Sequence, residues 1–272
     1  LSKGNLKTRV AVSGSDELTR LATALNDMAT ELGELYEGLE SRVQERTDEL
    51  EQATRKLRLL GSITRHDGLN QVAVISAWIS ILEETVTDDK GKEILGRMKE
   101  SASALEKYLT FTGTYEQIGV ERPTWIDLDS ALTTGLFGLD LKGVELVREV
   151  AGTEVFGDPM LPRVLRNLVE NSFRHGGQVS RMSFEVTEGP DGITIIYRDD
   201  GKGVPEDMKQ TIFERPIRSG RRSFGLYLSR EILSITGITI AEVGTPGKGA
   251  VFEIKVPKTR YRIVPPSTSG VI

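Results

Sequence analysis

The sequence predicts a multidomain protein in which an all-α part, a coiled coil followed by a helical hairpin, precedes an α+β sandwich domain. Residues 1–120 contain no proline and are rich in helix-forming residues, whereas glycines, prolines and short β-branched runs appear from Pro123 onward. Apolar residues recur at heptad spacing in the first part, and strand patterns alternate with a few helical patterns in the second. These observations place a boundary near residues 119–128.

Composition excludes several classes of function. The net charge of −5 and the pI near 5.4 give no overall attraction for nucleic acid, so we expect no nucleic-acid partner. The chain has no cysteine, which excludes disulfides, zinc–thiolate sites and thiol catalysis. The longest apolar run, residues 72–82, is too short for a bilayer, which needs about 20 residues.

A coiled coil is predicted for residues 36–60. Apolar side chains form two series spaced by seven or fourteen residues, with Arg46 at one position of the seam. A single amphipathic helix packed on its own domain is the alternative, and the length of the seam favours a parallel dimer. The two series are Leu32, Leu39, Ala53, Leu60 and Tyr36, Val43, Leu50, Leu57.

A helical hairpin is predicted for residues 61–118, with a turn at 87–93. Each helix carries an apolar stripe, and two such hairpins from a dimer would close a four-helix bundle. The stripes are Val72, Ile75, Ile79, Leu82, Val86 and Ile94, Met98, Ala102, Leu105, Leu109, Thr112.

The stretch "RHDGLNQV" (65–72) places polar side chains opposite the first stripe. His66 and Asn70 point about 160° away from the centre of the stripe, and Asp67 lies about 100° from His66. The pattern therefore argues against a buried core histidine. His66 is either a solvated surface residue or a residue that carries chemistry.

The second half predicts an α+β sandwich, a mixed sheet with helices on one face. Helical patterns cover 127–137, 159–176 and 225–236, and strand patterns cover 143–150, 179–186, 192–199, 237–244 and 250–257. Three clusters punctuate these elements, namely "NLVENSFRHG" (167–176), "RDDGKGVP" (198–205) and "GTPGKGAVF" (244–252). Each alone is a weak signal, because glycine pairs usually mark turns.

Taken together and in this order, the motifs resemble those of a sensor histidine kinase. "RHDGLNQV" resembles the phosphoacceptor box, "NLVENSFRHG" the N box and "RDDGKGV" the first glycine box. "IFERP" (212–216) resembles the F box, and "SFGLYLSREIL" (223–233) and "GKGAVFEI" (247–254) resemble the second and third glycine boxes. Residues 4–32 are similar to the second half of a HAMP signal-relay module.

For the hairpin, the resemblance implies a catalytic group of three residues. His66 would accept the γ-phosphoryl group of ATP on a ring nitrogen, because a neutral imidazole is nucleophilic. Asp67 would orient the proton on the other ring nitrogen. Asn70 would position the water that hydrolyses a phosphorylated response regulator, although a plain surface amide is the alternative.

For the second domain, the resemblance implies an ATP site of the GHKL type with Mg²⁺. Asn171 would ligate the metal and Asn167 would support it. Asp199 would accept a hydrogen bond from the adenine amino group. Phe213 would pack the base of the lid that covers the site. The other residues of the cofactor-binding set would be Arg174, His175, Gly201, Gly203, Gly225, Leu226, Gly247 and Gly249.

The segment between Gly203 and Gly225 matches an ATP lid, with basic residues that either neutralise phosphate or form a solvated loop. These residues are Lys209, Arg215, Arg218, Arg221 and Arg222. The second glycine box departs from the family pattern, because only Gly225 stands at a matching glycine position. Close approach of the backbone to phosphates is less assured there.

Two other functions compete with a bifunctional kinase and phosphatase. A pseudokinase scaffold would dimerise and bind a regulator without turnover, which the altered second glycine box favours. An ATPase of the gyrase or chaperone type would share the nucleotide fold. It would lack its water-activating glutamate, because Asn167 stands at the corresponding place.

The resemblance also implies an organisation and a location. The expected parts are 1–35, half of a HAMP module; 36–60, the coiled coil; 61–118, the phosphoacceptor hairpin; 126–258, the ATP-binding domain; and 259–272, a flexible tail. We expect a homodimer whose partner is the receiver domain of a response regulator. The parent would be a prokaryotic receptor anchored in the membrane through a missing N-terminal region, with this soluble part in the cytoplasm.

Overall fold

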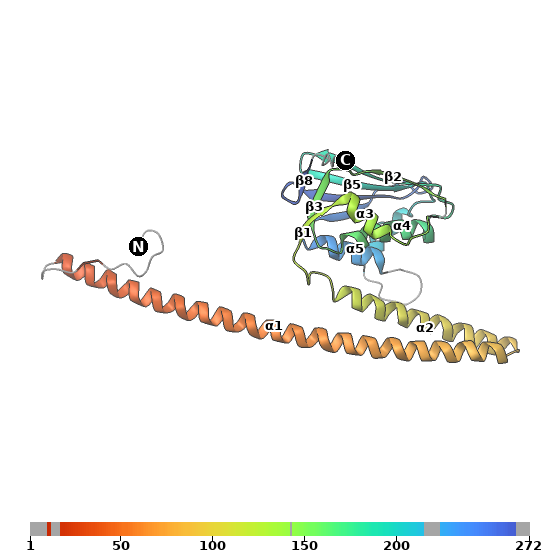
Figure 1. Cartoon of the computed structure of the whole chain (residues 1–272), viewed down its shortest axis with the longest axis horizontal. Coiled ribbons are helices and arrows are strands. Elements are labelled where there is room, and N and C mark those ends of the chain that lie inside the picture. The colour runs from red at the N-terminus through yellow and green to blue at the C-terminus, as the bar shows by residue number, and fades with distance from the viewer. Residues whose placement is uncertain (1–9, 12–16, 142, 215–223, 265–272) are drawn as a thin grey trace, which may run out of the picture. The chain divides into compact units, whose positions relative to one another are not determined.

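The computed structural model in Figure 1 describes residues 10–11, 17–141, 143–214 and 224–264. It divides into two compact units, residues 1–64 and residues 65–272, and the boundary falls inside the first helix. In the first unit, α1 begins at Glu17, and the side chain of Asn26 binds the backbone N–H and C=O of Val10, both at 2.9 Å. The backbone of Val10 therefore lies against the N-terminal part of α1.

Helix α1 (Glu17–Thr85) has 69 residues and joins the predicted coiled coil to the predicted hairpin without a break. Helix α2 (Asp89–Tyr115) begins after a short connection, and the Asp88 side chain caps it by accepting a hydrogen bond from the Gly91 N–H at 2.8 Å. The turn predicted for 87–93 is therefore wrong for its second half, which is the first turn of α2.

The C-terminal part of α1 and α2 run side by side as an antiparallel pair (Figure 1). Their contact buries Val72, Ile79, Leu95 and Ala102. Leu95, rather than its predicted neighbour Ile94, faces α1. Helical periodicity predicted the correct helix but placed the centre of the α2 stripe about one residue away.

The second domain contains two sheets. The five-stranded sheet has the order β2-β4-β5-β7-β6, in which β2 is parallel to β4 and the other pairs are antiparallel. Its strands are β2 (Glu145–Glu149), β4 (Arg181–Gly189), β5 (Gly192–Asp199), β6 (Thr239–Glu242) and β7 (Val251–Pro257). All five coincide with the predicted strand patterns, and the α+β sandwich is confirmed.

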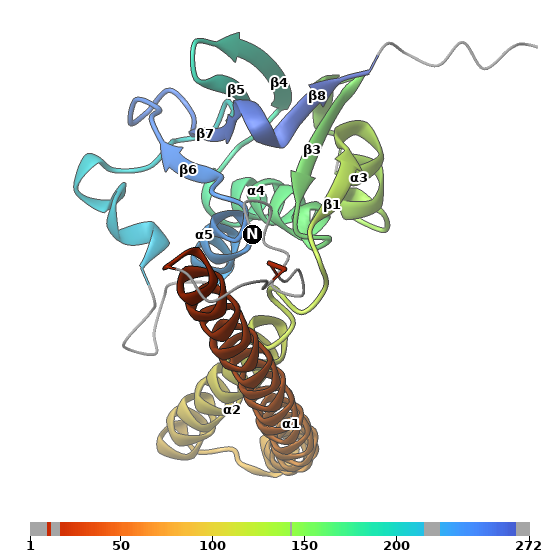
Figure 2. The ribbon, with the colours of Figure 1, turned by 90° about the vertical axis from the view of Figure 1, so that its left-hand side faces the viewer.

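Three helices accompany this sheet: α3 (Leu128–Leu136), α4 (Leu161–His175) and α5 (Gly225–Ser234). Figures 1 and 2 show α4 and α5 on one face of the sheet. The apolar side of α4 packs against buried sheet residues such as Phe184, Ile195 and Ile254. Three short 3₁₀ helices complete the elements: Glu206–Met208, Thr211–Phe213 and Lys258–Arg260.

A smaller sheet of order β1-β3-β8 was not predicted from the sequence. It contains β1 (Thr124–Asp127), β3 (Thr153–Gly157) and β8 (Tyr261–Ile263). The flexible tail predicted from residue 259 is wrong for β8, which pairs antiparallel with β3. Residues 265–272 lie outside the described part of the chain.

None of the helices among the described residues contains an apolar stretch long enough to cross a bilayer.

Candidate functional site

The carboxylate of Asp199 lies where β5 ends and joins two glycine-containing loops. Its Oδ1 accepts hydrogen bonds from the backbone N–H groups of Gly201 and Ala250, both at 2.9 Å. The structure thus brings together the first and third predicted glycine boxes around one buried acid. This carboxylate is fixed before any ligand arrives.

Glycine is required where the two loops meet. Gly249 has φ +95°, and a Cβ there would lie 1.8 Å from the Asp199 carbonyl oxygen. Gly203 has φ +69°, and its Cβ would lie 2.7 Å from the carbonyl oxygen of Gly249. The backbone therefore turns tightly beside Asp199, as the sequence motifs predict.

Asn167 and Gly225 connect α4 to the start of α5. The amide of Asn167 donates to the Ser229 hydroxyl at 3.0 Å, and Ser229 donates to the Gly225 carbonyl at 3.0 Å. A Cβ on Gly225 would lie only 1.9 Å from the Asn167 side-chain oxygen. This contact explains why glycine is needed at Gly225. The next residue, Leu226, is buried in the core.

Asn171 lies one turn after Asn167 on α4 and is buried. Its side-chain nitrogen has no hydrogen-bond partner among the described residues. The unsatisfied nitrogen is a donor, so it fits an acceptor atom of a bound ligand. The oxygen of the same amide is the kind of ligand that Mg²⁺ accepts. The described residues contain no cluster of three or more His, Cys, Asp or Glu side chains that could hold a metal without a nucleotide.

Arg174 and His175 end α4 at the rim of the same region. Burial of part of the imidazole lowers the pKa of His175, and the nearby charges of Arg174 and Lys202 lower it further. His175 therefore behaves as a neutral side chain in a basic environment. Such an environment suits an anionic ligand.

The predicted lid is described only at its two ends. The ammonium of Lys209 contacts Glu206 at 2.7 Å, donates to the Gly244 carbonyl at 2.6 Å and lies 3.7 Å from buried Glu242. These contacts hold the described end of the predicted lid against the end of β6 and the start of the segment 244–252. Phe213 is buried and packs edge-on against Phe252. Arg215, Arg218, Arg221 and Arg222 lie outside the described residues.

The altered second glycine box contributes aromatic contacts. Phe224 stacks on Phe111 of α2 with ring centroids 4.0 Å apart, and Tyr227 stacks on Tyr115 at 6.2 Å. Sequence reasoning missed this cluster, because it joins residues more than 100 positions apart. The aromatic positions gave no periodic signal.

His66 lies on the exposed side of α1, with 74% of its side chain accessible to solvent. Its Nδ1 lies 3.2 Å from Asp67 Oδ1 and 3.3 Å from the Asn70 amide. Both contacts are made to Nδ1, and no hydrogen bond reaches Nε2 within the described residues. The three polar residues of the predicted phosphoacceptor group therefore lie together, opposite buried Val72 and Ile79.

Arg65, directly before His66, was not singled out by the sequence. Its guanidinium forms an ion pair with Glu116, which follows the last residue of α2. A Cβ on Gly113 would lie 2.7 Å from the Arg65 Nε, so glycine makes room for this side chain. The pair fixes the turn of α1 that carries His66.

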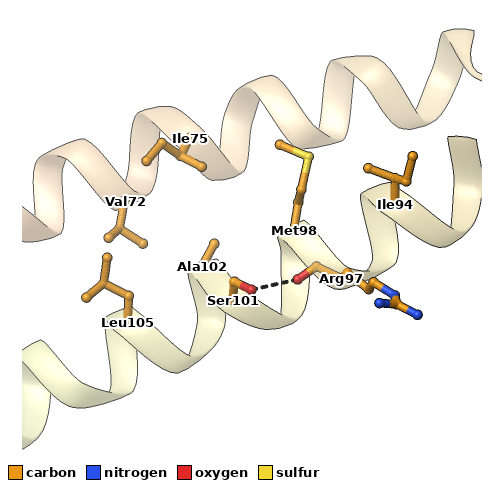
Figure 3. A pocket seen from close by; sticks show the side chains of 8 residues that line it. All are labelled: Val72, Ile75, Ile94, Arg97, Met98, Ser101, Ala102 and Leu105. Atoms are coloured by element: carbon orange, nitrogen blue, oxygen red, sulfur yellow. Dashed lines mark hydrogen bonds between the residues drawn. The ribbon is translucent and has the colours of Figure 1, made fainter. Parts of the chain in front are cut away.

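An apolar groove of about 420 Å³ runs along the hairpin (Figure 3). Val72 and Ile75 line it from α1, and Ile94, Met98 and Leu105 line it from α2. Figure 3 shows the guanidinium of Arg97 pointing away from these side chains. Four of the eleven predicted stripe residues, Ile75, Ile94, Met98 and Leu105, line this groove and are not among the residues buried between α1 and α2.

Two known protein families match parts of this chain. Residues 158–260 match the family of histidine kinase-, DNA gyrase B- and HSP90-like ATPases, and residues 1–34 match the HAMP domain. Asp199 and Asn171 lie inside the first match. The two matches therefore indicate an ATPase-class domain that follows a HAMP segment in the same chain.

Two relatives that match more than half of this chain are named as kinases. The signal transduction histidine-protein kinase AfsQ2 of Streptomyces coelicolor is 27% identical over 95% of this chain and 50% of its own length. The adaptive-response sensory kinase SasA of a Synechococcus species is 30% identical over 61% of this chain and 47% of its own length. These matches support a sensor histidine kinase with a HAMP part and an ATP-binding part. The chain spans about half the length of these relatives.

A solved structure shows the same fold. The crystal structure of full-length ShkA in complex with AMPPNP superposes with a TM-score of 0.53 at 18% sequence identity. The match covers 76% of this chain and 47% of that one. This likeness concerns the fold alone.

Proposed function

We propose that this chain is an ATP-dependent protein histidine kinase that autophosphorylates His66 and transfers the phosphoryl group to an aspartate of a response regulator. The observation that carries the proposal is the geometry at His66. The imidazole is exposed, its Nδ1 faces Asp67 and Asn70, and its Nε2 is accessible. An exposed nitrogen of this kind can meet two different macromolecular partners in turn.

The proposed site for ATP is the pocket around Asp199. Asp199 would accept a hydrogen bond from the adenine amino group, and Arg174 and His175 would face the phosphates. Mg²⁺, when bound, would neutralise charge on the phosphate oxygens, and the Asn171 amide would be its protein ligand. Gly201, Gly203, Gly247 and Gly249 would allow the backbone to approach the nucleotide.

The transfer step follows from the tautomer of His66. An ionised carboxylate only accepts hydrogen bonds, so Asp67 favours a proton on Nδ1 and leaves the lone pair on Nε2. The Asn70 NH₂ group is a donor and favours the opposite tautomer, and we take the charged Asp67 contact to be the stronger of the two. Nε2 would attack the γ-phosphorus of ATP, the bond from that phosphorus to the bridging oxygen would break, and ADP would leave. The product carries an N–P bond at Nε2, and the Nδ1 proton stays shared with Asp67.

Asn70 supports a second activity at the same place. Its amide lies within 3.3 Å of His66 Nδ1, on the same exposed face of α1. A docked and phosphorylated regulator would place its aspartyl phosphate beside this face, and the amide would orient the attacking water. We therefore propose that the chain also acts as a regulator phosphatase.

Dimerisation would complete the hairpin. The groove in Figure 3 leaves Ile75, Met98 and Leu105 at least 42% exposed, and the seam of α1 exposes Leu50 and Leu57 at 69% and 70%. An apolar surface of this extent is typical of an interface. A second copy of the chain would cover both surfaces, in a parallel coiled coil that continues into a four-helix bundle.

The proposed setting is a prokaryotic receptor anchored in the membrane through a segment that precedes this chain. The HAMP match over residues 1–34 supports the setting, because such modules relay signals between parts of receptors. The partner of the cytoplasmic part would be the receiver domain of a response regulator.

The test is incubation with γ-labelled ATP and Mg²⁺, in which the chain is compared with His66→Gln and Asp199→Asn. We expect label that survives base and is lost in acid, that disappears in His66→Gln, and that falls strongly in Asp199→Asn. Label that persists in His66→Gln would contradict the proposal.

A scaffold without turnover is the second candidate. The observation that favours it is the use of Phe224 and Tyr227 in aromatic contacts to α2, where the family pattern places a glycine box. Magnesium-dependent binding of ATP, measured by calorimetry, distinguishes the two functions. A kinase binds the nucleotide and becomes labelled, whereas a scaffold remains unlabelled.

A further inference from the structure

Behind the proposed base contact, three buried side chains form a chain of hydrogen bonds. The hydroxyl of Tyr197 lies 2.7 Å from the Ser172 hydroxyl, and Ser172 donates to Asp199 Oδ2. Tyr197 and Asp199 lie two residues apart on β5 and therefore on the same face of the strand. Ser172 reaches them from α4, directly after Asn171.

The direction of these hydrogen bonds is fixed by chemistry. Asp199, as a carboxylate, only accepts, so the single Ser172 proton goes to Oδ2. The Ser172 oxygen then accepts from Tyr197, which must be the donor. Burial raises the pKa of Tyr197 well above its usual range, so that the phenol keeps its proton at physiological pH. The hydrogen bonds of this chain, called the relay below, are therefore donated in one direction, from Tyr197 to Ser172 and from Ser172 to Asp199.

The hydrogen bonds already made leave the Asp199 carboxylate with a limited capacity to accept further ones. A carboxylate offers about four acceptor positions. Oδ1 already accepts from the N–H groups of Gly201 and Ala250, and Oδ2 accepts from Ser172. One acceptor position remains, on Oδ2. A base that presents an N–H donor satisfies it, whereas a base that presents an oxygen meets a carboxylate that has no proton to give.

We propose that Ser172 and Tyr197 are positioning residues for nucleobase selection, which hold Asp199 Oδ2 as an acceptor so that the site takes a 6-amino purine and rejects a 6-oxo purine. The inference rests on the proposed function, because it assumes that Asp199 meets the base. It adds two residues that act through Asp199 rather than on the nucleotide itself.

The experiment measures binding of ADP and of inosine diphosphate to the full chain by calorimetry, with Mg²⁺ present. ADP and inosine diphosphate differ at the 6-position and do not support phosphorylation of the protein. The wild-type chain should bind ADP more tightly by about tenfold to a hundredfold, as expected for one hydrogen bond to a charged group. This ratio of the two dissociation constants is the readout.

In Ser172→Ala the ratio should fall about tenfold, and in Tyr197→Phe it should fall by a smaller factor of about three. The double variant should match Ser172→Ala, because the two hydroxyls act in series. Ser172→Ala leaves the Tyr197 hydroxyl buried without a partner and can unfold the domain. The double variant removes both hydroxyls together, and it carries the test in that event.

Thr236→Val is the matched control. Thr236 is a buried residue whose hydroxyl has no hydrogen-bond partner within the described residues, and it follows the end of α5 remote from Gly225. Its removal should leave the ratio unchanged. A purely structural role of Ser172 would change the melting temperature and not the ratio.

The results of the binding experiment distinguish failure of the relay from failure of the proposed function. A ratio that stays at the wild-type value in the folded Ser172→Ala or double variant overturns the relay while ATP binding stands. A wild-type chain that binds neither nucleotide overturns the proposed function, and the relay with it. A ratio that falls in Ser172→Ala and falls no further in the double variant supports both.

Discussion

The hairpin and the ATP-binding domain differ in how completely each one buries its own apolar residues. The hairpin buries four apolar side chains between α1 and α2 and leaves an open groove beside them. The sandwich domain has a continuous core that includes residues from α3, α4, α5 and the five-stranded sheet. The proposed phosphoacceptor therefore lies on an element that needs a partner, whereas the proposed nucleotide pocket lies on one that does not.

The two proposed sites, at His66 and at Asp199, differ in burial in the same way as the parts of the molecule that carry them. His66 is exposed and has one ring nitrogen accessible, while Asp199 is buried and nearly saturated with hydrogen bonds. Exposure allows a residue to meet successive macromolecules, and burial allows a residue to select one small ligand. The two sites of the proposed phosphoryl transfer therefore have opposite structural requirements.

The self-sufficient domain should be the more sensitive to small changes in packing. Gly249→Ala would put a methyl group against the Asp199 carbonyl at a residue with φ +95°, and we expect a loss of about 3 kcal/mol of folding stability. Gly247→Ala is the matched control. Gly247 also has positive φ, at +84°, but open space surrounds its Cβ, so the loss should be about 1 kcal/mol. Urea unfolding measures both, and equal losses would contradict the steric account.

The hairpin should instead be sensitive at the groove. Ile75→Asp places a carboxylate on the proposed dimer surface, and we expect dimerisation to weaken by about 100-fold or more, measured by sedimentation equilibrium. Val74→Asp introduces the same charge at a residue of similar exposure, 51% against 44%, that does not line the groove. Its dimer should be nearly unchanged. A monomeric wild-type chain, or equal effects of the two variants on dimerisation, would contradict the assignment of the groove as the dimer surface.

The smallest expected effect concerns the histidine in the ATP-binding domain. The pKa of His175 lies below the 6.5 of an unfolded chain, chiefly because of burial and then because of Arg174 and Lys202. The unfolded chain therefore binds more protons in this window. The contribution of His175 to stability is present above about pH 6.5 and is lost as the pH falls through the folded pKa.

An NMR titration of the ring protons measures this value, and Arg174→Gln should raise the midpoint without restoring it fully, because burial remains. His175→Gln should flatten the dependence of the melting temperature on pH between about 5 and 7. A His175 midpoint at or above 6.5 would show that the basic neighbours do not act on the ring.

Periodicity and motif order predicted much of this molecule. The faces of the long helices, the five strands of the larger sheet and the surroundings of Asp199 follow from apolar spacing and glycine placement, which are local properties. Helical spacing is less able to fix which of two adjacent residues faces a partner, so Ile94 was predicted in place of Leu95. The strands β1, β3 and β8 are three to five residues long. Length alone does not explain why they were missed, because β2 and β6 are as short and lie inside predicted strand patterns.

The contacts that sequence missed join distant residues. The pairs Arg65–Glu116 and Phe111–Phe224, and the relay from Tyr197 to Ser172, each link side chains on different elements. Nothing in the spacing of such residues along the chain indicates that they meet. A neighbouring motif residue was the only available signal, since Ser172 follows Asn171 and Tyr197 precedes Asp199 by two positions.

The central claim is that Nε2 of His66 receives the phosphoryl group, and it is tested most directly by locating that group on the protein. The chain would be incubated with ATP and Mg²⁺, digested under alkaline conditions and analysed for the modified peptide and for the phosphohistidine isomer. The account predicts phosphate on the peptide containing residues 65–72, bound at Nε2, because Asp67 and Asn70 both face Nδ1. Phosphate at Nδ1, or on the peptide containing His175, would contradict it.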